Sequence, residues 1–232
     1  MAASGIAGYL LGTIASADVA ASLASNGQAD LRSSGSANPG ALNAALTLGK
    51  KWGAAVMVAD MAKGAVAAAV GRGLAGPAGA NLASSAAVCG HCYPIGRSGG
   101  KGVSTSIGQV LGTFPVYLPL DIAVGVATAA MPKWTQRTWA ATAAASVTWV
   151  GTSLLAFRRA VPTGIDGPAT VWLPVGSLIS SSIIAKRFLD IPLVDGKPRD
   201  DDGVPAERND EQVRSDDDDI GVHRLDQPTE PS

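Results

Sequence analysis

The sequence predicts an all-α membrane protein: a polytopic bundle of about seven short transmembrane helices followed by a disordered acidic tail. Over the first 194 residues, long runs of Ala, Val, Leu, Gly and Ile carry almost no charge. Charge is also divided unevenly. There are 13 basic and 6 acidic side chains before Asp195, and 5 basic and 13 acidic ones from Asp195 onward. We therefore expect a membrane domain over residues 1–194 and a separate tail over residues 195–232.

The individual spans follow from the apolar runs. A transmembrane helix needs about 20 apolar residues, and several runs here are shorter and rich in Gly and Ala, which let membrane helices pack closely. Pro115 and Pro119 divide the fourth run from the fifth, although either could instead kink one longer helix. A soluble cluster of buried alanine-rich helices is the alternative interpretation. No basic residue precedes the first run, so we expect no cleavable signal peptide. The predicted spans are residues 3–24, 53–71, 74–90, 103–117, 118–131, 138–157 and 168–185.

Basic residues predict the orientation of this bundle. Seven spans place the termini on opposite sides, and the side richer in Lys and Arg faces the cytoplasm. We therefore expect a bacterial inner-membrane protein with a cytoplasmic C-terminal tail. One set of loops holds nine basic residues and the other three: Arg32, Lys50, Lys51, Arg97, Lys101, Lys133, Arg137, Lys186 and Arg187 against Arg72, Arg158 and Arg159.

The tail contains two aspartate runs, residues 200–202 and 216–219, and no aromatic residue. Such like charges repel one another, and the segment has little apolar surface to bury, so we expect disorder. An interaction tail or a cation-binding segment is possible, but a solvated terminus explains the same composition.

Two glycine-rich loops, residues 35–43 and 99–102, are expected to lie together at the cytoplasmic face. A backbone with little side-chain bulk aims several N–H groups at one oxyanion, and Lys101 adds a point charge. The second loop is not a nucleotide P-loop, because Ile95 and Gly102 replace the glycine and the Ser or Thr of that motif. These loops predict a pocket for phosphorylated small molecules beside lipid. The alternative for Lys101 is a glycine-rich turn with a lysine that reaches to the interface.

Charged side chains within the apolar runs form a second group of candidates. Asp60 and Lys63 lie three residues apart on one helical face, where they can pair with each other or reach into a polar site. Asp18 and Asp121 are intramembrane carboxylates with no obvious neighbouring partner. Cys89 and Cys92 could form a reactive thiol pair, but small residues packed at a helix end explain them better.

These features together resemble the bacterial membrane glycerol-3-phosphate acyltransferases that use an acyl-phosphate donor, the PlsY family. The order and approximate spacing of the motifs match over residues 5–110. The matching stretches are residues 8–14 (GYLLGTI), 30–32 (DLR), 35–43 (GSANPGALN), 48–53 (LGKKWG), 60–64 (DMAKG), 90–94 (GHCYP) and 99–105 (GGKGVST).

The resemblance implies a seven-helix inner-membrane enzyme that moves a fatty acyl group from acyl-phosphate to the first hydroxyl of glycerol 3-phosphate, giving lysophosphatidic acid. It implies no metal or organic cofactor and no nucleic-acid partner; the partners are the two substrates and the lipid bilayer. His91 and Lys101 would be the catalytic residues. The residues that would bind the substrate phosphate are Ser36, Asn38, Gly40, Asn43, Arg97, Gly99, Gly100 and Lys101.

The chain departs from the family pattern at several positions. Ala37 stands where the family has glycine, Leu42 where it has threonine, and Leu46 where it has a phosphate-binding arginine. The family's third motif is reduced to residues 187–191. Of the cytoplasmic cations, Arg97 is the best substitute for the lost arginine, with Arg32, Lys50 and Lys51 as others. Two alternatives therefore stay open: a catalytically silent paralogue that binds a phospholipid or phosphorylated metabolite, and a small transporter.

Overall fold

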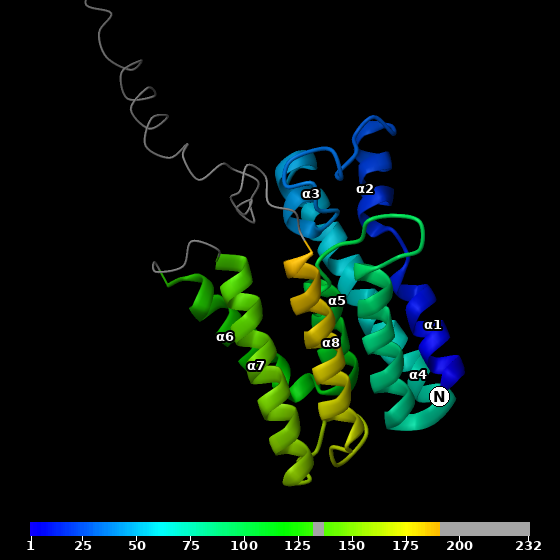
Figure 1. The fold of residues 1–232 in the computed structure, drawn as a ribbon, viewed down its shortest axis with the longest axis vertical. Helices are drawn as coiled ribbons and strands as arrows, with labels where there is room; N and C mark the ends of the chain where they lie inside the picture. The colour runs from blue at the N-terminus through cyan, green and yellow to red at the C-terminus, as the bar shows by residue number, and fades with distance from the viewer. Residues whose placement is uncertain (132–136, 191–232) are drawn as a thin grey trace, which may run out of the picture.

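The computed structural model describes residues 1–131 and 137–190, whose regular secondary structure is helical throughout. The tail predicted over residues 195–232 and the basic residue Lys133 lie outside the described residues. Figure 1 shows α2 and α3 at one end of the bundle and the N-terminus at the other. The elements are α1 (Ala2–Gly12), α2 (Ser16–Ser25), α3 (Ala41–Leu48), α4 (Lys50–Cys92), α5 (Val103–Thr113), the 3₁₀ turn η1 (Pro115–Tyr117), α6 (Leu118–Ala129), α7 (Arg137–Arg158) and α8 (Trp172–Leu189).

Helix α4 is a hairpin of two helical arms. Its 43 residues are interrupted at Ala75 and Gly76, where the dihedrals leave the helical region, and Pro77 follows directly. Gly76 has a φ of 58°, a left-handed conformation that glycine adopts without strain. The arms then touch through their backbones, since a Cβ added at Gly71 would lie 2.1 Å from the carbonyl oxygen of Gly79. These arms correspond to the spans predicted at residues 53–71 and 74–90.

The helices on either side of α4 pack against it through glycine. A Cβ added at Gly8 of α1 would lie 2.0 Å from the carbonyl oxygen of Ala83, on the second arm. On the first arm, a Cβ added at Gly64 would lie 2.1 Å from the carbonyl oxygen of Thr105, in α5. Membrane helices associate through such small residues because the lipid supplies little hydrophobic drive between them.

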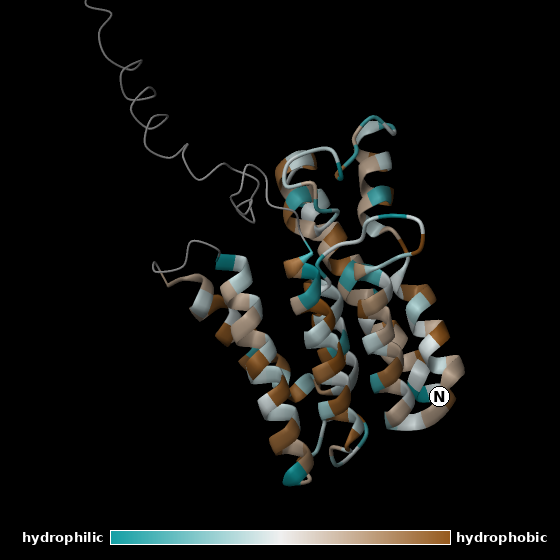
Figure 2. Cartoon of the chain, viewed as in Figure 1, coloured by the Kyte–Doolittle hydropathy of each residue, from teal (hydrophilic) through white to brown (hydrophobic). Residues whose placement is uncertain are grey.

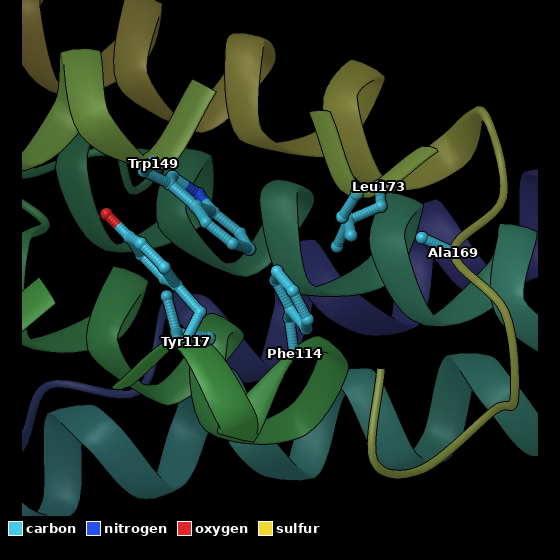
Figure 3. Close-up of a cluster of buried hydrophobic side chains, with 7 residues drawn as sticks. Phe114, Tyr117, Trp149, Ala169 and Leu173 are labelled. Atoms are coloured by element: carbon cyan, nitrogen blue, oxygen red, sulfur yellow. The ribbon is translucent and has the colours of Figure 1, made fainter. Parts of the chain in front are cut away.

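An aromatic cluster holds the bend between α5 and α6. The two helices meet at 118° around η1, where Pro115 removes a backbone donor. Phe114, Tyr117 and Trp149 of α7 are buried together there, and the ring centroids of Tyr117 and Trp149 are 5.1 Å apart (Figure 3). The proline that the sequence marks as a boundary therefore separates two helices.

The predicted all-helical membrane architecture is confirmed. Three helical stretches are long and apolar enough to cross a membrane: Ala2–Ser25, which joins α1 and α2, Lys50–Cys92 and Arg137–Arg158. The bent pair α5 and α6 gives a fourth if it is one span. Figure 2 shows hydrophobic and neutral colours along most of the length of these helices, with hydrophilic residues mainly toward their ends. The span predicted at residues 3–24 corresponds to the stretch Ala2–Ser25, whose helix is interrupted between Gly12 and Ser16.

An ion pair fastens the end of the bundle near the N-terminus. Arg72 of α4 forms two hydrogen bonds with Asp166, at 2.5 and 2.8 Å, and a third with the carbonyl oxygen of Gly112 at 2.6 Å. This group joins the hairpin, the end of α5 and the loop before α8. The sequence places Arg72 on the side opposite the glycine-rich loops, which agrees with this position.

Replacing Gly108 by alanine should destabilise the fold. A Cβ at Gly108 would lie 1.9 Å from the carbonyl oxygen of Met61, so α5 must move off α4. Overpacking of this kind costs about 1–3 kcal/mol, and we expect a lower Tm for the detergent-purified protein. Gly125→Ala is the control, because its Cβ would meet no atom within 4 Å; it should leave the Tm unchanged or raised. Equal Tm values for the two variants would contradict this packing.

Candidate functional site

A narrow cleft opens where α1, α2, the second arm of α4 and the loop after α4 meet. Its free volume is about 20 Å³, roughly the room needed for one water molecule. The lining combines backbone at residues 12–15 with polar and charged side chains from distant parts of the chain. Those side chains include Ser16, Asp18, Arg32, Lys63, His91, Arg97 and Ser98.

Two arginines at the cleft share one carboxylate. Arg32 Nη1 lies 2.5 Å from Asp18 Oδ1, and Arg97 Nη1 lies 3.9 Å from Asp18 Oδ2. Arg97 also donates a hydrogen bond to the carbonyl oxygen of Thr13. Asp18, which has no evident partner in the sequence, is therefore paired, and one positive charge of the two arginines is left unbalanced by it. An anion is the ligand that such a surplus favours.

The floor of the cleft is a buried ion pair. Lys63 Nζ lies 2.8 Å from Asp60 Oδ1, and the two side chains are 7% and 2% exposed. Lys63 also reaches His91, whose Nδ1 lies 3.1 Å away. Both expectations for this pair hold, since the two residues neutralise each other and Lys63 also lines the cleft.

The second glycine-rich loop is held in place by arginine side chains. Arg187 of α8 donates to the carbonyl oxygens of Gly99 and Gly100 at 2.8 and 3.2 Å. Arg32 donates to the carbonyl oxygen of Ser98 at 3.0 Å. The Gly100 N–H is itself used, since it donates to the carbonyl oxygen of His91. Gly99 and Gly100 thus line the cleft, and the positive charge around them comes from the side chains of arginine residues.

The first glycine-rich loop is organised around a buried asparagine. Asn43 is fully buried, and its Nδ2 donates to the carbonyl oxygens of Leu31 and Ser34 at 2.8 and 3.0 Å. Its Oδ1 accepts the Ser36 N–H at 3.1 Å. Asn43 therefore holds the loop in shape through these three hydrogen bonds. The cleft is lined by Pro39 of this loop, whereas Ser36, Asn38, Gly40 and Asn43 are not among its lining residues.

The end of α8 also anchors the residue that follows α4. The Tyr93 hydroxyl donates to Asp190 Oδ2 at 2.7 Å, and Lys186 Nζ lies 2.7 Å from the same oxygen. Burial, together with Asp190, raises the pKa of the Tyr93 phenol. Hydrogen bonds from Lys186 and Tyr93 lower the pKa of Asp190. Arg187 and Asp190 belong to the stretch that matched the third motif, and both brace the neighbourhood of the cleft. The motif match did not predict this bracing role. The feature of the sequence that could have indicated it is the pair Lys186 and Arg187 at the end of the last span.

A family model described as glycerol-3-phosphate acyltransferase matches residues 2–188. The chain belongs to the glycerol-3-phosphate acyltransferase family. A relative of that name from Thermoanaerobacter sp. (strain X514) is 37% identical over 131 residues, which are 56% of this chain and 65% of the relative. One from Dinoroseobacter shibae is 41% identical over 123 residues, 52% of this chain and 58% of the relative. The matched stretches thus span less than two thirds of these relatives.

The fold is also similar to that of a solved member of the family. The crystal structure of PlsY (YgiH), an integral membrane glycerol 3-phosphate acyltransferase, in its glycerol 3-phosphate form matches with a TM-score of 0.65 and 26% identity. The match covers 82% of this chain and 88% of that one. The lysophosphatidic acid form of the same enzyme matches with a TM-score of 0.62 and 25% identity, over 80% of this chain and 86% of that one.

Two positions singled out by the family pattern lie away from the cleft. Lys101 is not a lining residue; its Nζ lies 4.7 Å from the ring centroid of Phe188, which stacks on Trp139 of α7 at 5.5 Å. Leu46, in the place of the family's arginine, is 55% exposed on α3. The cations that the structure brings to the cleft are instead Arg32, Lys63 and Arg97.

A second cavity, of about 260 Å³, lies between α5, α6, α7 and α8. Its walls are largely apolar, with Val103, Ile107, Trp149 and Ile184 among them. Asp121 lines this cavity, and within the described residues it has no ion-pair partner. Cys89 and Cys92 are free thiols; Cys92 is buried beside Val88 and Ile184, which fits the packing role.

Asn43→Ala should loosen the first glycine-rich loop. It leaves two carbonyl oxygens and the Ser36 N–H without their partner, and an unsatisfied buried polar group costs about 1–3 kcal/mol. We expect a lower Tm and faster protease cleavage within residues 31–40. Leu42→Ala is the neighbouring control, because Leu42 is exposed on the same helix. Unchanged cleavage in Asn43→Ala would show that Asn43 does not hold the loop.

Ala37→Gly should stabilise the same loop. Ala37 has a φ of 56°, and a left-handed conformation costs a non-glycine residue about 1–2 kcal/mol. The greater freedom of glycine in the unfolded chain offsets about 0.5–1 kcal/mol of this, so a small rise in Tm is expected. Ala45→Gly, inside α3, should instead lower the Tm, because glycine in a helix lowers the free energy of unfolding by about 1 kcal/mol. A fall in Tm for both variants would refute strain at Ala37.

Proposed function

We propose that this chain transfers a fatty acyl group from acyl-phosphate to the first hydroxyl of glycerol 3-phosphate, giving lysophosphatidic acid. The observation that carries the proposal is a cleft with surplus positive charge in a fold of the glycerol-3-phosphate acyltransferase family. The solved relatives were obtained in glycerol 3-phosphate and lysophosphatidic acid forms. We place the cleft at the cytoplasmic face of a bacterial inner membrane, where the acidic tail also lies.

The cleft would hold the phosphate of glycerol 3-phosphate between Arg32 and Arg97. Guanidinium groups bind phosphate oxygens in a fork that a lysine cannot reproduce. Phosphate would take over the place of Asp18, whose carboxylate lies beside both arginines. Because the cleft is narrow, the Arg97 side chain must swing outward to admit the ligand; it lies on an exposed loop, which permits that movement. These two residues supply the charge lost with the family's arginine at Leu46.

The donor would bind on the other side of the second glycine-rich loop. Gly99 and Gly100 line the cleft, whereas Lys101 lies over Phe188 on the α8 side. The apolar cavity begins next to this lysine, at Val103 and Ile184. The acyl chain would lie in that cavity and its phosphate near Lys101, so that the loop separates the two substrates. This arrangement keeps Lys101 as a phosphate ligand, with Ser36, Asn38, Gly40 and Asn43 shaping the approach.

The reaction needs positioning and charge neutralisation more than a protein nucleophile. Acyl-phosphate is a mixed anhydride with a good leaving group. The C1 hydroxyl oxygen attacks the acyl carbon, the carbon–oxygen bond to phosphate breaks, and the departing phosphate takes the hydroxyl proton. Cations beside both phosphates stabilise the charge that develops, and holding the substrates together supplies much of the rate.

A binding protein without catalysis is the second candidate. It is favoured by the exposed Leu46 in the place of an arginine, and by Arg187 in the reduced third motif, which braces the loop instead of facing the cleft. Such a paralogue would bind glycerol 3-phosphate or a phospholipid headgroup through the same arginines.

Arg97→Gln and Arg32→Gln test this function. Purified protein in lipid, given acyl-phosphate and glycerol 3-phosphate, should form lysophosphatidic acid. Loss of one partner of a charged pair costs about 2–5 kcal/mol, so kcat/KM should fall about thirtyfold or more in each variant. Lys101→Ala should abolish the product.

Arg158→Gln is the matched control, because Arg158 is exposed at the last residue of α7; it should retain full activity. Absence of product with the unaltered chain, together with binding of glycerol 3-phosphate, would establish the silent paralogue. Full activity in Arg97→Gln and Arg32→Gln would remove these arginines from the site.

A further inference from the structure

The buried network beneath the cleft fixes the charge state of Lys63. Its Nζ lies 2.8 Å from Asp60 Oδ1 and 2.9 Å from the carbonyl oxygen of Ile14. The Ser16 hydroxyl donates to the same Asp60 oxygen. A buried carboxylate must be paired and hydrogen-bonded to stay ionised, and these contacts meet that need. Lys63 is therefore an ammonium, with hydrogen atoms to donate and no lone pair to accept.

The ammonium decides which nitrogen of His91 carries the proton. Lys63 Nζ lies 3.1 Å from His91 Nδ1, so Nδ1 must be the acceptor. The other candidate partner, Asp60 Oδ1, lies 3.6 Å from Nδ1, beyond hydrogen-bond distance. A doubly protonated ring would place two cations 3.1 Å apart in a buried site. His91 is therefore neutral, with its proton on Nε2.

The protonated nitrogen lies against the glycine-rich loop. A Cβ added at Gly100 would lie 2.3 Å from His91 Nε2, so glycine is required there for the ring to keep its position. His91, Gly100, Arg32 and Arg97 all line the cleft. The Nε2–H group is thus a neutral donor at a site that also holds the cationic side chains of Arg32 and Arg97.

We propose that Lys63 and Asp60 are positioning residues that hold His91 as the neutral Nε2–H tautomer, and that this N–H donates a hydrogen bond to a phosphate oxygen in the cleft. His91 then acts as a binding donor and takes no proton from the hydroxyl of the acceptor. The phosphate identity rests on the proposed function; the tautomer rests on the geometry alone. The ligand that this site would bind is a phosphate monoester such as glycerol 3-phosphate.

Nuclear magnetic resonance of the imidazole nitrogens tests the tautomer directly. The chain has two histidines, His91 and His223, so His223→Gln leaves one ring to observe. With ¹⁵N-labelled histidine, the unaltered site should show the Nε2–H pattern at neutral pH. Saturating glycerol 3-phosphate should shift the Nε2 resonance more than the Nδ1 resonance. An Nδ1–H pattern, or no shift at saturation, would overturn the proposal.

Lys63→Met should release the tautomer, giving a mixture of the two neutral forms. Because this change leaves Asp60 buried without its partner, Asp60→Asn combined with Lys63→Met is the second variant, which removes both charges. Lys186→Met is the control, since Lys186 is exposed on α8; it should keep the Nε2–H pattern. A fixed Nε2–H form in the double variant would show that another group sets the tautomer.

Two substitutions of His91 separate its nitrogens. The amide nitrogen of Gln reaches the position of Nε2, whereas that of Asn reaches only the position of Nδ1. His91→Gln should nearly preserve KM for glycerol 3-phosphate, and His91→Asn should raise KM about ten- to hundredfold, as expected for a lost hydrogen bond to a charged group. Equal KM values for the two variants would contradict the donor role. A bell-shaped dependence of kcat on pH in the unaltered chain that is lost in both variants would also contradict it, because it would show that His91 transfers a proton.

Inorganic phosphate and glycerol 3-phosphate serve as separate probes in the same spectra. A shift of Nε2 with either ligand in a chain that forms no lysophosphatidic acid would keep this inference while refuting catalysis. A chain that forms product but whose Nε2 resonance does not shift with either ligand would refute this inference while keeping the proposed catalysis.

Discussion

Close approach of helix backbones is the constraint on which this structure depends. The two arms of α4 touch at Gly71 and Gly79, α1 touches the second arm at Gly8, and α5 touches the first arm at Gly64. At each place a single methyl group would overlap a carbonyl oxygen of the neighbouring helix. This packing brings Asp60 and Lys63 of one arm next to His91 of the other, and both beneath the break between α1 and α2. The polar network can form because glycine at these contact points lets the helix backbones come together.

The electrostatics of the cleft follow from where the chain puts its few carboxylates. Asp60 is assigned to Lys63, and Asp18 to Arg32 and Arg97. Arg187 is occupied differently, since it donates to carbonyl groups of the glycine-rich loop. Cations in one small region thus have distinct tasks: balancing a buried charge, bracing a loop, or facing the opening. The proposed phosphate ligand binds the cations that face the opening, Arg32 and Arg97. Their present partner is the Asp18 carboxylate, which the phosphate can replace.

Local patterns predicted the features whose cause lies close in sequence. Apolar runs gave the helical membrane class, the three-residue spacing of Asp60 and Lys63 gave their pairing, and Pro115 gave the boundary between α5 and α6. The break at residues 13–15 was missed because it contains no proline or glycine. The contact of Asp18 with Arg97 could not be read from the sequence, since Arg97 lies 79 residues away in it. Lys101 was expected in the cleft because it follows Gly99 and Gly100. The structure instead places its Nζ over the ring of Phe188 in α8.

The contact between Arg72 and Asp166 has a consequence for biogenesis. Chains are made from the N-terminus, so the α4 hairpin is synthesised 94 residues before the aspartate that neutralises its arginine. On the proposed topology Arg72 must be translocated to the outer surface while its counter-ion is still unmade. The Arg72 guanidinium at the tip of the nascent hairpin therefore stays solvated until the loop before α8, with Asp166, has been synthesised and inserted. That late capture makes closure of the outer end one of the last events in assembly.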